Sequence, residues 1–93
     1  MRWFDIKHYY STVDGTVLTH SDLTIVDNQR VVYARFERPN GNGFDFAEGT
    51  IPFCCFSKTY GFSEDELFEL ADYLQHNSIL IWDYAQKGGG INA

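Results

Sequence analysis

The chain has 93 residues, of which 44% are hydrophobic and 17% aromatic, enough for one small domain with a packed core. This composition excludes a disordered chain. The formal net charge of −6 disfavours direct binding to nucleic acid or to an anionic membrane, since both need a basic surface. A basic protein is the partner that such a charge favours, although acidity can also serve solubility alone.

The negative charge is unevenly distributed along the chain. Residues 1–38 contain five acidic and five basic residues, whereas residues 39–93 contain eight acidic residues and only two lysines. The whole imbalance therefore lies in the second part of the chain, where a functional surface would use it.

The sequence predicts a cytoplasmic protein, in the host cytoplasm if a phage encodes it. The N-terminal stretch MRWFDIKHYY has no apolar core of a signal peptide, and no apolar run approaches the ~20 residues of a membrane span. The two cysteines, Cys54 and Cys55, are adjacent and would point to opposite faces of a strand. We expect both to be buried free thiols in a reducing compartment.

The first part of the chain reads as short strands joined by turns. Alternating residues from Trp3 to Tyr10 predict a half-buried strand, and Asp14-Gly15 predicts a turn. Residues 17–19 and 23–26 form two strand segments, or one strand interrupted at His20-Ser21-Asp22.

The clearest predicted strand runs from Arg30 to Arg38, after a tight turn at Asp27-Asn28-Gln29. One face of this strand is expected to be apolar, and it comprises Val32, Ala34 and Phe36. A strong turn signal at residues 39–43 predicts a hairpin whose second strand includes residues 44–47.

Residues 51–56 predict a further strand, with Pro52 at an edge or outside the hydrogen-bonded ladder.

The best-defined predicted element is a helix from Ser63 to His76. Ser63 and Glu66 have the spacing of a capping box, and Phe62 with Leu67 has that of a hydrophobic staple. A core-facing stripe at i, i+3, i+4 and i+7 comprises Leu67, Leu70, Ala71 and Leu74. Asn77 is expected to end the helix.

The run ILIWDY, Ile79 to Tyr84, is short and β-branched and predicts a final buried strand. The fold class is therefore α+β: a mainly antiparallel sheet of four to six strands, one amphipathic helix (64–76) packed on one face, and a last strand. Residues 1–87 form the single domain, and residues 88–93 form a flexible glycine-rich tail.

No motif in the sequence supports an enzyme, a cofactor or a metal site. His20-Ser21-Asp22 places catalytic residue types side by side, but catalytic triads assemble from residues distant in sequence. Asp72 and His76 have an i, i+4 spacing that fits an ion pair better than a metal site, because no third ligand is visible. No glycine-rich phosphate loop lies between a strand and a helix. We therefore expect a non-enzymatic protein.

Three arginines, Arg30, Arg35 and Arg38, lie on one predicted hairpin, and Tyr33 shares a face with Arg35. Such a basic and aromatic patch can contact nucleic acid. Cross-strand ion pairing is the interpretation that the acidic chain favours.

The candidate binding surface is the acidic face of the predicted helix. It comprises Asp65, Glu69 and Asp72, with Phe68 and Tyr73 on its flanks as possible aromatic anchors. The face contains no lysine or arginine, so it forgoes the i, i+4 salt bridges that commonly stabilise a surface helix. A merely solvated outer face is the alternative interpretation.

The sequence favours an acidic protein-binding module, an inhibitor of a basic protein that handles nucleic acid, such as a nuclease. In size, charge and lack of a catalytic motif the chain is similar to immunity proteins that neutralise nuclease toxins. It is equally similar to phage inhibitors of bacterial defence nucleases that imitate DNA, the anti-CRISPR type among them. The alternative is a structural or assembly subunit that uses sheet edges and exposed aromatic residues, among them Trp3, Tyr9, Trp82 and Tyr84.

Overall fold

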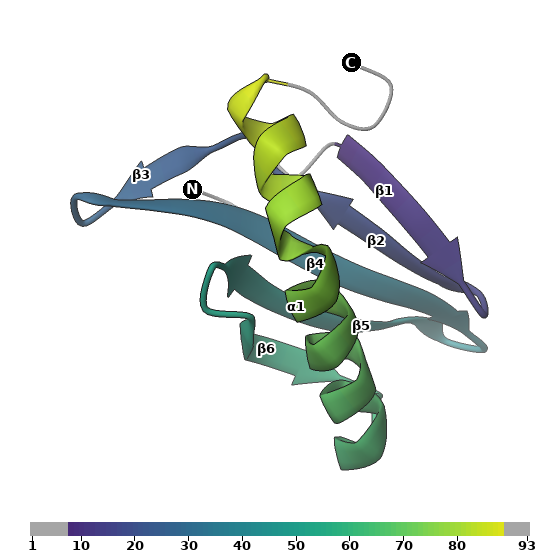
Figure 1. The fold of residues 1–93 in the computed structure, drawn as a ribbon. Helices are drawn as coiled ribbons and strands as arrows, with labels where there is room; N and C mark the ends of the chain where they lie inside the picture. Colours follow the sequence, from purple (N-terminus) through teal and green to yellow (C-terminus); the bar gives the residue numbers. More distant parts are fainter. Residues whose placement is uncertain (1–7, 89–93) are drawn as a thin grey trace.

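The computed structural model describes residues 8–88 as an antiparallel sheet followed by one long helix (Figure 1). The α+β class and the predicted sheet are therefore confirmed. The elements are β1 (His8–Val13), β2 (Thr16–His20), β3 (Thr24–Val26), β4 (Gln29–Asn40), β5 (Gly43–Ile51), β6 (Cys55–Tyr60) and α1 (Glu64–Gln86).

The sheet has the strand order β1-β2-β4-β5-β6, and β3 pairs with the beginning of β4. The 12-residue strand β4 forms its centre. Val32 and Ala34 are fully buried and Phe36 is nearly so, as the alternation in the sequence predicts. Leu18 and Ala47 lie opposite Phe36 on the neighbouring strands, so one face of the sheet is continuously apolar.

Two predicted turns are confirmed. Asp14 and Gly15 have φ of 51° and 80°, and Asp27 and Asn28 have φ of 51° and 64°. Positive φ at both central residues is the geometry that fits the twist of a two-residue β-hairpin. Asp, Asn and Gly are the residues that adopt it at least cost, which is why the sequence predicts both turns.

The predicted strand over residues 51–56 is wrong in its boundaries. Ile51 ends β5, a turn follows, and β6 begins only at Cys55. Within the turn, the Cys54 amide donates a hydrogen bond to the Thr50 carbonyl over 2.7 Å. Both cysteines are free, but only Cys54 is buried, so the prediction of buried thiols holds for one of them.

The helix α1 begins as predicted but continues to Gln86, and the predicted final strand at 79–84 is wrong. The Ser63 capping box is formed in both directions. Asn77 does not end the helix; it lies within α1, and its side chain accepts a hydrogen bond from the Tyr10 hydroxyl over 2.7 Å. Ile81 and Ala85 continue the stripe of Leu74 onto the sheet, so packing outweighs the weak helix propensity of β-branched residues.

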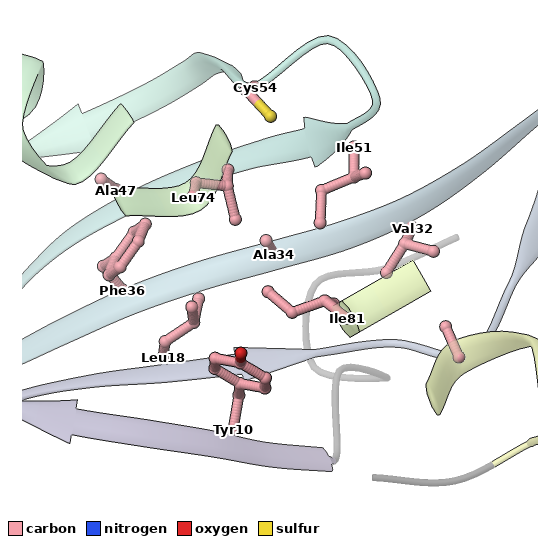
Figure 2. Close-up of a cluster of buried hydrophobic side chains, with 11 residues drawn as sticks. Tyr10, Leu18, Val32, Ala34, Phe36, Ala47, Ile51, Cys54, Leu74 and Ile81 are labelled. Carbon is pink, nitrogen blue, oxygen red and sulfur yellow. The ribbon is translucent and has the colours of Figure 1, made fainter. Parts of the chain in front are cut away.

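The hydrophobic core lies between the sheet and the inner side of α1 (Figure 2). Leu74 and Ile81 are fully buried against the apolar face of the sheet. The buried cluster comprises Tyr10, Leu18, Val32, Ala34, Phe36, Ala47, Ile51, Cys54, Leu74, Ile81 and Ala85.

Two predictions fall partly outside the described residues. Of the strand predicted from Trp3 to Tyr10, residues 3–7 are not described, and residues 8–10 begin β1. Of the tail predicted at 88–93, only Gly88 is described. Across residues 8–88, no helix has both the length and the apolar character that a membrane crossing requires.

Candidate functional site

The predicted acidic residues lie on the side of α1 that faces away from the sheet. Asp65, Glu69 and Asp72 are all exposed, and so is Phe68, whose side chain is 75% exposed. We call these four residues the outer face of α1. Their 3.6-residue spacing places them opposite the buried Leu74.

Ile79 extends this surface and was missed by sequence reasoning, which placed it in a buried strand. It is 86% exposed and follows Asp72 by two turns of the helix. The signal that could have found it is the helical period itself, which runs unbroken from Phe68 through Asp72 to Ile79.

The carboxylates of the outer face have no lysine or arginine beside them among residues 8–88. Within the part of the chain that the structure describes, no lysine or arginine forms an ion pair with Asp65, Glu69 or Asp72. Asp72 does contact His76, whose Nδ1 lies 3.4 Å from the carboxylate and 2.8 Å from the backbone carbonyl of Asp72. The predicted i, i+4 contact is thereby confirmed.

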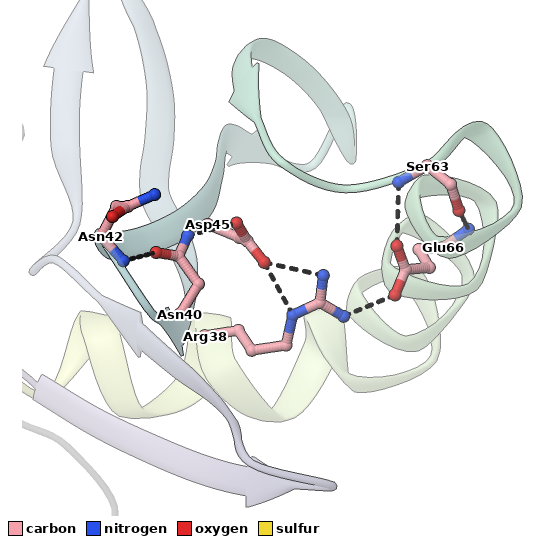
Figure 3. Close-up of polar contacts among 6 residues, drawn as sticks. All are labelled: Arg38, Asn40, Asn42, Asp45, Ser63 and Glu66. Carbon is pink, nitrogen blue, oxygen red and sulfur yellow. Dashed lines mark hydrogen bonds and ion pairs between the residues drawn. The ribbon is translucent and has the colours of Figure 1, made fainter.

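Glu66, another acidic residue of α1, differs from the outer carboxylates because it forms an ion pair with Arg38. Figure 3 shows the Arg38 guanidinium between Asp45 and Glu66, with all three of its nitrogens donating to carboxylate oxygens. The hydrogen bond from Arg38, followed by that from the Ser63 amide, lowers the pKa of Glu66 from 4.5 to about 2. Arg38 and then Asn40 likewise lower the pKa of Asp45. Glu66 therefore links α1 to the sheet through its ion pair with Arg38 of β4.

Arg35 is also paired within the sheet. Its guanidinium binds the buried Glu48 of β5 and lies 3.1 Å from Glu37, and it covers the Phe46 ring at 4.7 Å. The expected cross-strand ion pairing of the hairpin arginines is thus confirmed for Arg35 and Arg38.

Tyr73 does not lie on the outer face. Its ring packs edge-on against Phe36 with centroids 6.4 Å apart, and its hydroxyl is 2.9 Å from Ser11 Oγ. The residue predicted as a flanking aromatic anchor therefore faces the β1–β2 hairpin.

A groove of about 320 Å³ separates the β1–β2 hairpin from the N-terminal half of α1. Leu18, Phe36 and Leu70 are apolar residues of its lining. The polar lining residues are Ser11, Asp14, Thr16, Arg38, Glu66, Glu69 and Tyr73. The sequence could not reveal this groove, because it is assembled from segments far apart in the chain.

In the segment His20-Ser21-Asp22, the histidine and the serine are not arranged as a catalytic base and its nucleophile. His20 Nδ1 donates to the Ser21 carbonyl over 2.8 Å, while Ser21 Oγ donates to the Asp22 carbonyl over 2.8 Å. The Asp22 carboxylate is 2.6 Å from His8 Nε2. Burial lowers the pKa of His20. Among residues 8–88, no three His, Cys, Asp or Glu side chains cluster in a way that could hold a metal ion.

Comparisons of the chain with protein-family models, with curated proteins and with solved structures find no match.

Proposed function

We propose that this protein is a non-enzymatic acidic binding module that inhibits a basic protein, such as a nuclease or another protein that binds nucleic acid. The outer face of α1 would occupy the basic groove in which the partner normally holds phosphates. The observation that carries this proposal is that three carboxylates without a lysine or arginine partner lie together on the outer face of α1, whereas the arginines of β4 bind other carboxylates.

The carboxylates bound by arginine stabilise the fold. Arg35 and Arg38 together bind four carboxylates, those of Glu37, Asp45, Glu48 and Glu66. The carboxylates of Asp65, Glu69 and Asp72, which have no lysine or arginine partner among residues 8–88, lie together on one helix face. Grouped like charges without lysine or arginine counter-ions repel each other and raise the local negative potential, which favours fast association with a basic surface.

The spacing of the outer carboxylates suits a phosphate-binding groove. A rise of about 1.5 Å per residue spreads the residues from Asp65 to Asp72 over about 10 Å of one helix face. A groove that binds successive phosphates of a nucleic acid strand can therefore contact all three carboxylates at once.

Phe68 and Ile79 add apolar contact area to the same face. They are 75% and 86% exposed; Phe68 lies among the carboxylates, and Ile79 follows Asp72 by two turns. Exposed single apolar residues are common on protein surfaces, but apolar side chains at the centre of an interface often supply much of its binding energy. Together the charges would steer the partner, and the apolar residues would hold it.

Two biological settings fit this proposal. One is immunity against a nuclease toxin, and the other is a phage-encoded, DNA-mimicking inhibitor of a host defence nuclease, of the anti-CRISPR type, acting in the host cytoplasm.

The test is affinity capture from a bacterial lysate with the full chain as bait, eluted either by salt or by double-stranded DNA. We expect a basic nucleic-acid-binding protein to be captured and released by both, because DNA would compete for the same groove. The variant Asp65→Asn/Asp72→Asn should lose most of this capture. Phe68→Ala should weaken it further.

Matched controls separate the site from the overall charge. Asp27→Asn/Glu64→Gln removes the same two charges outside the outer face, and Phe53→Ala removes a comparably exposed phenyl ring from the β5–β6 turn. Both controls should retain capture. Equal loss in the variants and their controls, or capture that DNA does not release, would contradict the proposed function.

A second candidate function, an assembly subunit joined through sheet edges, has one observation in its favour. Tyr60 of the edge strand β6 and Phe44 of β5 are 63% and 53% exposed. Lys58 in β6 counts against edge pairing, since a charged edge residue discourages it. Of the aromatic residues expected to mediate assembly, Tyr9 is 49% exposed, whereas Trp82 and Tyr84 pack against the core. A strictly monomeric chain at high concentration in light scattering would exclude this candidate.

A further inference from the structure

We propose that the groove between the β1–β2 hairpin and α1 binds one cationic side chain, an arginine or a lysine, of the basic partner. This inference rests on the proposed function and assigns a recognition pocket to it. The apolar stem of the side chain would lie on Val13 and Leu70, which both line the groove, and its charged end would lie between Asp14 and Glu69.

The charges of the groove select a cation. Asp14, Glu66 and Glu69 contribute three carboxylates to the lining, against the single guanidinium of Arg38. Every nitrogen of that guanidinium already donates to Asp45 or Glu66, so it offers little to an incoming anion. Asp14 and Glu69 have no basic partner among residues 8–88, and they remain to bind a positive group.

The two carboxylates lie on opposite walls of the groove. Asp14 belongs to the β1–β2 turn and Glu69 to α1. Ser11 and Tyr73 also line the groove and join its walls through their hydroxyl groups, which are 2.9 Å apart. Hydroxyl oxygens retain free lone pairs in such a contact and can accept further hydrogen bonds from a guanidinium or an ammonium group.

The size of the groove sets the scale of its occupant. About 320 Å³ is near the lower limit of small-molecule sites, which span about 300–1,000 Å³. This volume fits one long side chain better than a nucleotide or a folded peptide segment. The aliphatic stems of lysine and arginine cover apolar surface while their charged ends stay hydrated, which matches an apolar floor with acidic walls.

Glu69 connects this groove to the outer face of α1. It is exposed, it lines the groove, and it follows Asp65 by one turn. A basic partner that covers the outer face is therefore within reach of the groove, and its arginine or lysine would fix the partner's position on the helix.

The test uses butylguanidinium as the probe, a single positive charge on a four-carbon stem, titrated into the isotope-labelled full chain and followed by NMR. We expect weak saturable binding with shifts centred on Val13, Leu70 and Tyr73. Pentanoate, which has the same stem with a carboxylate, should cause no such shifts. Asp14→Asn/Glu69→Gln should weaken butylguanidinium binding about threefold to tenfold, as expected for the loss of two partly exposed ion pairs.

The matched control is again Asp27→Asn/Glu64→Gln. Asp27 has the same φ of 51° as Asp14, and Asn tolerates that conformation well, so both double variants should fold. The control should bind butylguanidinium as the wild type does. Absence of shifts at the groove, equal binding of pentanoate, or equal weakening in both double variants would overturn the proposal.

This titration is independent of the partner. If butylguanidinium fails to bind but capture still depends on Asp65 and Asp72, only the groove assignment is wrong. If butylguanidinium binds but DNA does not release the captured protein, the groove is a cation site and the proposed inhibitor function is wrong.

Discussion

The inner and outer faces of α1 are built from one continuous helix of 23 residues, yet they meet different surroundings. On the inner face, Leu74 and Ile81 are fully buried against the sheet. Phe68 on the outer face is 75% exposed, and Ile79, which extends this surface two turns beyond Asp72, is 86% exposed. Large apolar side chains therefore occur on both faces, but only those of the inner face stabilise the fold by burial.

The acidic residues differ in the same way. Glu66 and Asp65 are neighbours in the sequence, but Glu66 binds Arg38 and Ser63, whereas Asp65 has no ion pair within the described residues. Acidity in the sequence is thus not evidence of function by itself. The partner of each carboxylate decides whether it belongs to the fold or is available to another molecule.

The largest expected effect is a difference between two truncations on α1. Leu74→Ala should lower the free energy of unfolding by about 2–5 kcal/mol, because it leaves a cavity in the core. Phe68→Ala should change it by no more than about 0.5 kcal/mol, since the ring contributes little burial. Denaturant unfolding followed by circular dichroism measures both. Similar losses would mean that the outer face also packs against the protein.

A smaller effect concerns how the stability of the folded protein depends on acid at the Glu66–Arg38 ion pair. The pKa of Glu66 is 4.5 ordinarily and about 2 in the folded protein, so its ionised form is favoured by folding. This stabilisation is fully present above about pH 4.5 and is lost as the pH falls toward 2. In Glu66→Gln, the melting temperature should therefore fall less steeply between pH 4.5 and 2 than in the wild type.

The comparison variant for this measurement is Arg38→Met. It removes the largest cause of the lowered pKa of Glu66 and also the largest cause of the lowered pKa of Asp45. It should reduce the pH dependence at least as much as Glu66→Gln. A wild-type slope in both variants would show that the Arg38 contacts do not stabilise the folded state in solution.

The smallest expected effect on stability is at Glu69. Asp65 and Glu69 stand at i and i+4 with like charges, so Glu69→Lys replaces a repulsion by a favourable pair. We expect a gain of a few tenths of a kcal/mol in the free energy of unfolding, with loss of partner capture in the same variant. Thermal unfolding at low salt measures the gain. A clear destabilisation would show that Glu69 has a structural contact on the groove side.

The local elements of the fold could be predicted because they depend on neighbouring residues. Positive φ at Asp14-Gly15 and at Asp27-Asn28 follows from the few residue types that tolerate it. The start of α1 follows from Ser63 and Glu66, which satisfy each other's backbone donors.

The candidate site was predicted in part. Asp65, Phe68, Glu69 and Asp72 are exposed on one face of a helix, as the periodicity predicts. Tyr73 was assigned to the same surface but faces Ser11, since the direction of a flanking side chain depends on what stands beside it. The groove was not predictable, because its walls come from the β1–β2 hairpin and from α1.

The sequence alone determined the turns, the central strand β4, the helix start and the acidity of the helix, since each depends on residues within a few positions of one another. Only the tertiary structure decided where α1 ends and which carboxylates are paired. Ile79 to Tyr84 has the composition of a strand, yet Ile81 and Ala85 gain more from packing on the sheet than their propensities cost. Arg38 likewise meets Glu66 only after folding brings β4 beside α1.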